Sequence, residues 1–218
     1  LGRGRSPMNW SILEGRKCYY ANLFKYDAGA DSGNILDTFK FNITDNDTGE
    51  TMHFKQTLAM IRMIENNFYD LMDNNITLKK QKDVTPTYYP KRCPSDSLID
   101  WDMDVNDLDR FIRAVTKPFN GAYCYTSKPL CSKVIIYNSQ IFDTLDFGYE
   151  QEENGKIVEV FPNGKFLVKC RGGLLLVNDY TIHDGTIKAG EVLNVGDEEL
   201  HYFKTNKYGY YDLEEHDE

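Results

Sequence analysis

The stretch "DAGADSG", residues 27–33, places two carboxylates and a hydroxyl among glycines and alanines. A carboxylate in such a loop can accept a proton or orient a neighbouring imidazole, and glycines let the backbone approach a ligand closely. The simpler alternative is a solvated turn in which an aspartate caps the backbone. The residues by themselves leave both interpretations open, and Asp31 is the candidate for chemistry.

Histidines and cysteines do not show the spacing of a metal or disulfide site. None of the four histidines stands four residues from another, so we predict no structural zinc and no other metal site. The five cysteines are an odd number without a CxxC pair: Cys18, Cys93, Cys124, Cys131 and Cys170. This usage predicts reduced thiols in a cytoplasmic protein.

Charge is distributed unevenly along the 218 residues. Residues 145–218 hold 16 acidic and 7 basic side chains, whereas residues 1–144 hold 18 of each. A surface that binds a nucleic-acid backbone needs basic residues, so the second half disfavours such a partner. No stretch approaches 18 consecutive apolar residues, and we therefore predict no membrane span.

The elements that must hold the glycine-bearing loop are two predicted strands, "CYYANLFKY" before it and "NILDTFKFNI" after it. A short helix should precede them, with Ser6 as its cap and Pro7 at its first position. A long helix should follow, capped by Asp47 or Thr48. Its apolar residues recur every three or four positions and predict a buried face: Met52, Leu58, Ile61, Ile64, Phe68, Leu71 and Met72.

The second half begins after a proline-rich segment, residues 79–97, which reads as a linker or an extended crossing. A helix is predicted in "VNDLDRFIRAVTK", with Val105, Leu108, Phe111, Ile112 and Val115 on one face. Five short strands separated by glycine-bearing turns come next: residues 121–127, 133–142, 155–161, 164–170 and 173–182. This pattern predicts a small β-barrel or sandwich.

Four blocks, in order, resemble the formyltransferase family that uses N10-formyltetrahydrofolate: "GRGRSPMNWSILEG", "LFKYDAGADSGNIL", "SLIDWDMDVNDLDRFIRAVTKPFNGAY" and the strands from "GKIVEVF". The family includes methionyl-tRNA formyltransferase and enzymes that formylate amino sugars on nucleotide carriers. The resemblance implies an α/β fold followed by β: the C-terminal part of an open sheet with helices, then a small barrel-like β domain.

The implied domains are the catalytic part at residues 1–83, a linker at 84–96, a helix plus barrel at 97–205, and an acidic tail at 206–218. The family's catalytic asparagine and histidine belong to an N-x-H segment upstream of the block that matches "GRGRSP", and this chain contains neither. With no starting methionine, the sequence is expected to be a piece of a longer protein.

The resemblance assigns Asp31 to the family's catalytic aspartate. Formyl transfer to an amine develops an oxyanion, which the upstream amide and a protonated histidine would stabilise. A carboxylate beside that histidine raises its pKa and can relay a proton through water. The resemblance also makes four loop residues candidates for folate contact (Asp27, Ala28, Gly29 and Ala30) and three others candidates for substrate contact (Arg3, Arg5 and Asn9).

Structural roles are expected for the other residues in these blocks. Trp10 is expected in the core and not as a substrate platform. Asp100, Trp101 and Arg113 are expected to serve packing, with Arg113 paired to Asp109 at helical spacing.

Three functions stay open. The first is formylation of a nucleotide-linked amino sugar, which the acidic second half favours. The second is formylation of methionyl-tRNA, which the basic segment "KKQKDVTPTYYPKR" favours. The third is a non-catalytic binding module, since the asparagine and histidine are absent. A homodimer is possible in each case.

Overall fold

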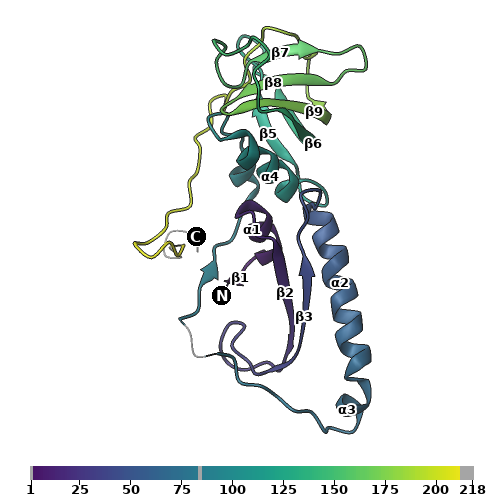
Figure 1. Cartoon of the computed structure of the whole chain (residues 1–218). Helices are drawn as coiled ribbons and strands as arrows, with labels where there is room; N and C mark the ends of the chain where they lie inside the picture. Colours follow the sequence, from purple (N-terminus) through teal and green to yellow (C-terminus); the bar gives the residue numbers. More distant parts are fainter. Residues whose placement is uncertain (1, 83–84, 212–218) are drawn as a thin grey trace. The chain divides into compact units, whose positions relative to one another are not determined.

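The computed structural model describes residues 2–82 and 85–211, which divide into two compact units. The first unit holds the described residues up to Arg92 together with residues 203–211, and the second is Cys93–Tyr202 (Figure 1). The predicted boundary at residues 83 and 84, and the predicted acidic tail from residue 212 onward, lie outside the described residues. Within the described ranges, no helix has the length and apolarity needed to cross a membrane.

An antiparallel strand pair, β2 (Cys18–Phe24) and β3 (Ile35–Asn42), carries the first unit and confirms both predicted strands. Helix α1 (Pro7–Leu13) precedes the pair, with Pro7 at its start as predicted. The predicted cap at Ser6 is wrong in one respect. Ser6 occupies the capping position, but its backbone is left-handed (φ 50°) and its side chain makes no capping hydrogen bond.

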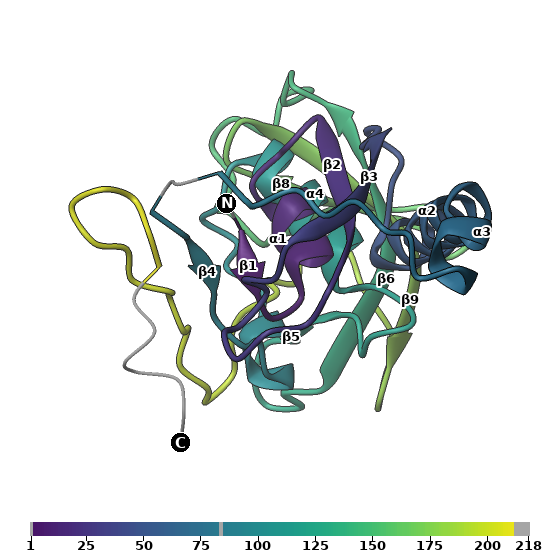
Figure 2. The same ribbon diagram turned by 90° about the horizontal axis from the view of Figure 1, so that it is seen from below.

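The proline-rich segment is tied to the first unit along its extended backbone. Strand β4 (Tyr88–Tyr89) pairs in parallel with β1 (Arg3–Gly4), and the two lie side by side in Figure 2. Further upstream, the backbone groups of Lys79 and Ile35 exchange two hydrogen bonds of 2.8 Å. The segment therefore follows the strand pair closely enough to bring its side chains to the glycine-bearing loop.

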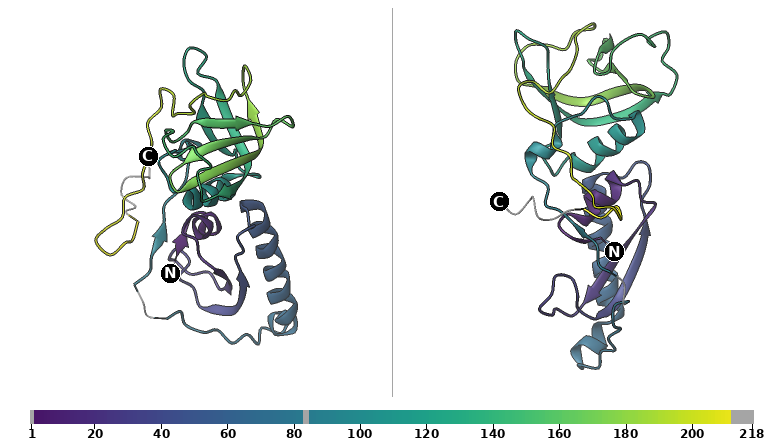
Figure 3. Two further views of the ribbon diagram at one scale, coloured as in Figure 1. Left: turned by 45° about the horizontal axis from the view of Figure 1, so that its top comes forward. Right: turned by 90° about the vertical axis from the view of Figure 1, so that its left-hand side faces the viewer.

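The buried face predicted for helix α2 (Gly49–Asn66) is wrong for most of its residues. Thr48 caps it as predicted, and α3 (Phe68–Met72) follows. Of the seven predicted core residues only Met52 is fully buried, and the others are 40–70% exposed. Ala59 and Met63 instead pack with Ala21 of β2. The reason is geometric: the two strands lie along one face of the helix (Figure 3), whereas its apolar residues extend around more than that face.

The second unit opens with a 3-10 turn, η1 (Pro94–Ser97), and helix α4 (Val105–Val115). Asp104 caps α4 by accepting the N–H of Asn106 at 3.0 Å. The five residues predicted to share a face are all buried: Val105, Leu108, Phe111, Ile112 and Val115. The helix packs chiefly on β6 of the sheet described next.

Five antiparallel strands form the sheet of the second unit, in the order β5-β6-β9-β8-β7. All five were predicted, and their bounds are β5 (Ala122–Tyr125), β6 (Lys133–Asp143), β7 (Ile157–Val160), β8 (Phe166–Cys170) and β9 (Gly173–Ile182). A segment after β9 joins the two edges of the sheet. Asn194 exchanges two 2.8 Å backbone bonds with Tyr125 beside one edge, and Leu193 N–H donates to Gly155 O at 2.9 Å beside the other. The predicted separate β domain is therefore confirmed as a five-stranded antiparallel sheet whose two edges this segment bridges, and the described strands do not close into a barrel.

Candidate active site

The loop between β2 and β3, residues 25–34, is organised by Asp27. Its Oδ1 atom accepts the N–H of Gly29 at 3.0 Å and the hydroxyl of Ser32. The Ser32 hydroxyl, followed by the Gly29 N–H, holds the pKa of Asp27 below its usual value. The turn-capping alternative therefore describes Asp27, whose carboxylate is engaged within its own loop.

Gly33 sets the width of the loop where the chain enters β3. It is buried, and a Cβ placed on it would lie 1.7 Å from the carbonyl oxygen of Lys25. The N–H of Lys25 donates to Asn34 O at 3.0 Å across the same narrow point. A side chain at position 33 would push the two arms of the loop apart, so the glycine is a steric requirement.

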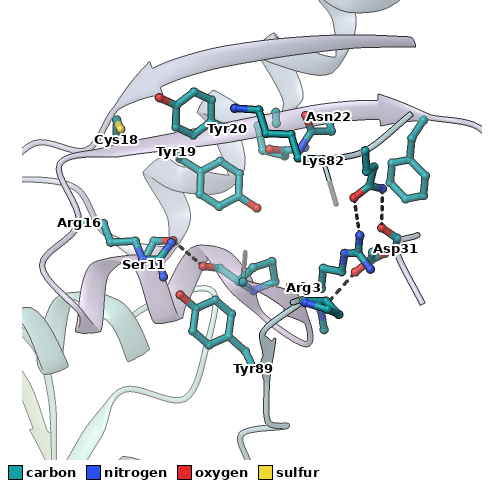
Figure 4. Close-up of a pocket in the computed structure, with 18 residues that line it drawn as sticks. Arg3, Ser11, Arg16, Cys18, Tyr19, Tyr20, Asn22, Asp31, Lys82 and Tyr89 are labelled. Atoms are coloured by element: carbon teal, nitrogen blue, oxygen red, sulfur yellow. Dashed lines mark hydrogen bonds between the residues drawn. The ribbon is translucent and has the colours of Figure 1, made fainter. Parts of the chain in front are cut away.

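Asp31 stands between these two glycines with its backbone in the left-handed region (φ 52°). Aspartate tolerates this conformation better than most residues, but holding it requires support from the surroundings. Part of that support comes from Gly4, whose N–H donates to Asp31 Oδ2 at 3.2 Å. Figure 4 shows Asp31 beside Arg3, at the wall of a cavity.

Gln81 fixes the backbone of the same loop from a distant part of the chain. Its amide nitrogen donates to the carbonyl oxygens of Asp31 at 2.8 Å and Gly33 at 2.7 Å. Its amide oxygen accepts a 2.5 Å hydrogen bond from the guanidinium of Arg3. Gln81 thus links Asp31, the candidate catalytic residue, to Arg3, a candidate for substrate contact.

A cavity of about 700 Å³ opens along β2, inside the first unit. Its wall comes from residues 2–4, helix α1, strand β2, Asp31 and four residues of the proline-rich segment: Gln81, Lys82, Pro86 and Tyr89 (Figure 4). The volume lies in the range of small-molecule and cofactor sites. β2 is hydrogen-bonded to β3 alone among the described strands, and six of its seven residues line the cavity.

The charge of the cavity wall favours an anionic ligand. Among the described residues that line it, Arg3, Arg16 and Lys82 are basic and Asp31 is acidic. Aromatic surface is provided by Tyr19, Tyr20, Phe24 and Tyr89. Burial, with the negative charge of Asp31 as a second cause, raises the pKa of Tyr19, so this phenol stays protonated and able to donate a hydrogen bond at neutral pH.

The predicted site residues are brought together only in part. Arg3 and Asp31 both line the cavity. Arg5 is exposed outside its lining, and Asn9 is 6% exposed within α1. The four folate candidates, residues 27–30, lie on the exposed side of the loop and not in the cavity wall.

Residues expected to have structural roles lie as predicted. Trp10 is 3% and Trp101 6% exposed. Arg113 donates to Asp109 Oδ2 at 2.8 Å, and both side chains are nearly buried. Asp100 accepts the hydroxyl of Tyr202 at 2.8 Å within the second unit.

Sequence reasoning missed Gln81, Arg16 and Tyr89. Gln81 and Tyr89 sit in the proline-rich segment, where no periodicity singles out any side chain. Arg16 follows the short helix in a glycine-bearing turn and resembles any solvated base. Only the pairing of this segment with residues 2–4 and with Ile35 reveals that these side chains meet at one cavity.

Neither a histidine nor a metal cluster belongs to the described site. No histidine is among the residues that line the cavity. Across residues 2–82 and 85–211, no three His, Cys, Asp or Glu side chains are grouped to hold a metal ion.

Comparison with known proteins identifies a family and relatives among the curated proteins. A family model described as the formyl transferase C-terminal domain matches residues 93–201, which is half of the chain. The bifunctional polymyxin resistance protein ArnA of Wigglesworthia glossinidia brevipalpis is 32% identical over 139 residues. That alignment covers 64% of this chain and 21% of ArnA, so the chain spans about a fifth of the relative.

Solved structures resemble both units. HypX from Aquifex aeolicus, in complex with tetrahydrofolic acid, has a TM-score of 0.65 and 16% identity over 84% of this chain and 30% of its own. The N-formyltransferase from Helicobacter canadensis, in complex with folinic acid and dTDP-3-aminofucose, has a TM-score of 0.62 and 20% identity over 82% of this chain and 62% of its own. At these identities the likeness establishes the fold.

Proposed function

This chain belongs to the formyltransferase family, and on that premise we propose that it is part of an enzyme that transfers a formyl group from N10-formyltetrahydrofolate to an amine. The observation that carries the proposal is the position of Asp31. Its strained backbone is held by Gln81 and its carboxylate by Gly4, at the wall of a cavity of ligand size. Strain of this kind, maintained by neighbours from other segments, is typical of functional residues.

The loop fits a folate. Residues 27–30 are exposed and three of the four have no side chain beyond a methyl group, so a flat ring could reach their backbone groups. Asp27, Ala28, Gly29 and Ala30 would hold the folate, which supplies the formyl group when bound. The folate compounds in the HypX and Helicobacter canadensis structures support this assignment.

Asp31 would act on protons. As a carboxylate it can accept the proton that the attacking amine loses, through a water molecule, and it can orient a histidine and raise that histidine's pKa. The asparagine and histidine of the N-x-H segment would come from the part of the enzyme that precedes residue 1. The 218-residue chain by itself is therefore expected to be inactive, which would leave a binding module as its only isolated activity.

The proposed amine belongs to a nucleotide-linked sugar in the cytoplasm. Three basic side chains in the cavity wall suit the phosphates of such a substrate, and Arg3 can offer two donors to one phosphate. Methionyl-tRNA is the alternative. In residues 145–218 acidic side chains exceed basic ones by nine, and a charge of this sign opposes the binding of an RNA backbone.

The test is an assay of the complete enzyme with 4-amino-sugar nucleotides carrying dTDP, UDP or GDP, and with methionyl-tRNA, each in the presence of N10-formyltetrahydrofolate. We expect formylation of a sugar nucleotide. Turnover of methionyl-tRNA alone would replace the substrate assignment. If the complete gene product lacks an N-x-H segment and formylates no amine, the proposal that it is an enzyme is wrong. The hypothesis of a non-catalytic binding module would then remain.

A further inference from the structure

The end of the described chain forms a small hairpin, residues 203–211. Thr205 and Tyr211 form an antiparallel bridge, and the backbone N–H of Asn206 donates to Tyr210 O at 2.7 Å. The side-chain oxygen of Asn206 accepts the N–H of Tyr208 at 2.9 Å, and Gly209 completes the turn with φ 74°. These contacts hold the two ends of the hairpin together and give it a defined shape.

The two ends of this hairpin pack on one tryptophan of the first unit. The ring of Phe203 meets Trp10 edge-on with centroids 4.9 Å apart, and the ring of Tyr211 meets it at 4.6 Å. Tyr89 is stacked on Trp10 at 5.5 Å with an interplanar angle of 6°, and its ring lies 5.9 Å from that of Tyr211. The guanidinium of Arg92 lies 5.3 Å from the rings of both Trp10 and Phe203.

Tyr89 connects this aromatic cluster to the cavity. Its hydroxyl donates to Glu14 Oε2 at 2.7 Å, and the same oxygen accepts the Nε–H of Arg16 at 2.6 Å. The Arg16 guanidinium also lies 5.6 Å from the centre of the Tyr89 ring. Tyr89 and Arg16 both line the cavity, so their positions depend on a ring system whose outer members are Phe203 and Tyr211.

We infer that the hairpin 203–211 is a positioning element of the cavity: by clamping the Trp10–Tyr89 stack it fixes the guanidinium of Arg16 where an anionic ligand binds. Phe203 and Tyr211 are then positioning residues, because their contacts are with the stack and not with the ligand. The inference rests on the proposed function in taking the ligand to be a nucleoside diphosphate. It gives a role to an aromatic segment that formyl transfer itself does not require.

Direct binding to the 218-residue chain tests the inference. Calorimetric titration with dTDP, UDP and GDP in turn should give a dissociation constant that rises about tenfold in Phe203→Ala and Tyr211→Ala, the loss of roughly one hydrogen bond to a charged group. Tyr211→Phe keeps the ring but loses the hydroxyl contact with Glu14, so its dissociation constant should lie between those of the wild type and Tyr211→Ala. Tyr208→Ala is the matched control, since Tyr208 lies in the same hairpin, is 69% exposed and packs with Tyr210.

Thermal unfolding of each variant separates positioning from folding, because a purely structural role would lower the midpoint without changing the affinity of the folded protein. If Phe203→Ala does not fold, Tyr211→Ala decides. Wild-type affinity in folded Tyr211→Ala would overturn the inference, and so would failure of the wild type to bind any of the three nucleotides.

The complete enzyme distinguishes this inference from the proposed function. Sugar formylation with an unchanged KM in Tyr211→Ala would overturn the hairpin's role and leave the function intact. Suppose instead that the protein formylates no substrate but Tyr211→Ala still weakens nucleotide binding. That result would support the hairpin's positioning role and contradict the proposed formyltransferase function.

Discussion

The backbone N–H of Gly4 donates to the Oδ2 atom of Asp31 across 3.2 Å, joining two segments that lie 27 residues apart in the chain. Gln81 approaches the same loop from a third segment and binds the carbonyl oxygens of Asp31 and Gly33. Groups outside the turn therefore fix Asp31: the Gly4 N–H binds its carboxylate, and the Gln81 side chain binds its backbone. Asp27, five residues before Ser32, has its partners within the turn. The two aspartates of one loop are therefore suited to different roles.

Replacing the charge of Asp31 should remove catalysis and leave the fold. The amide oxygen of Asp31→Asn can still accept the Gly4 N–H, but the side chain no longer takes up a proton. We expect formyl transfer by the complete enzyme to fall by about 10²- to 10⁴-fold, the usual range for loss of a general base. The thermal midpoint should be unchanged because the side chain is exposed.

Asp27→Asn is the control for this experiment, since it sits in the same loop and also removes one negative charge. Its carboxylate organises the turn, so a modest loss that appears mainly in folate affinity is expected. An Asp31→Asn enzyme that kept most of its activity would remove Asp31 from the chemistry.

Gly33→Ala should destabilise the loop by steric conflict. The added methyl would lie 1.7 Å from Lys25 O, a backbone atom that cannot rotate away. We expect a loss of about 1–3 kcal/mol in the free energy of unfolding, as for overpacked sites, and faster amide hydrogen exchange in residues 25–34. Asn34→Ala, at the exposed neighbouring position, should change the free energy by less than about 0.5 kcal/mol. Equal stability of the two variants would contradict the crowding at position 33.

The second unit was the easier part to predict. The apolar residues of α4 recur at helical spacing and become fully buried, because the helix packs on a broad sheet. Burial alternates along much of β6 and along the second half of β9, whereas β8 is buried at all five residues. In both cases local pattern and tertiary packing agree, so the sequence alone indicates the element and the face that is buried.

The first unit shows where sequence reasoning stops. The apolar residues of α2 predicted a core face, yet the two-stranded partner covers Ala59 and Met63 and leaves Leu58 and Ile61 exposed. Gln81 offers no local signal, because its role depends on bonds to residues 50 and 78 positions away. Which face of a helix is buried, and which distant side chain reaches a loop, depend on neighbours that periodicity does not describe.

Asp47 should make stability depend on acid pH. It is buried and accepts bonds from Thr44 N–H at 2.7 Å, Thr51 Oγ1 at 2.8 Å and Lys55 Nζ at 2.5 Å. Burial alone would raise its pKa, but these bonds outweigh burial and hold the pKa below the usual value. The stabilisation is therefore present above about pH 4, the unfolded pKa, and is lost as the pH falls through the lower folded pKa.

Urea unfolding of Asp47→Asn measures this effect. At pH 7 we expect a loss of about 1–3 kcal/mol, and the difference from the wild type should shrink below about pH 4. Asp45→Asn is the control: its partner Lys17 is 3.1 Å away, both side chains are largely exposed, and its loss should cost less than about 1 kcal/mol. A difference between Asp47→Asn and wild type that stayed constant with pH would show that the charge contributes nothing.

The apolar side chains on the outer face of α2 should make the 218-residue chain self-associate. Leu58 is 63% and Ile61 46% exposed, and a contiguous patch of this kind binds other apolar surfaces. Leu58→Lys combined with Ile61→Glu should abolish concentration-dependent association in analytical ultracentrifugation and reduce binding of the dye ANS, with little change in the thermal midpoint. Met63→Lys, on the buried face at 1% exposure, should instead unfold the first unit. A wild-type chain that stayed monomeric and bound no dye would show that this face is covered in solution.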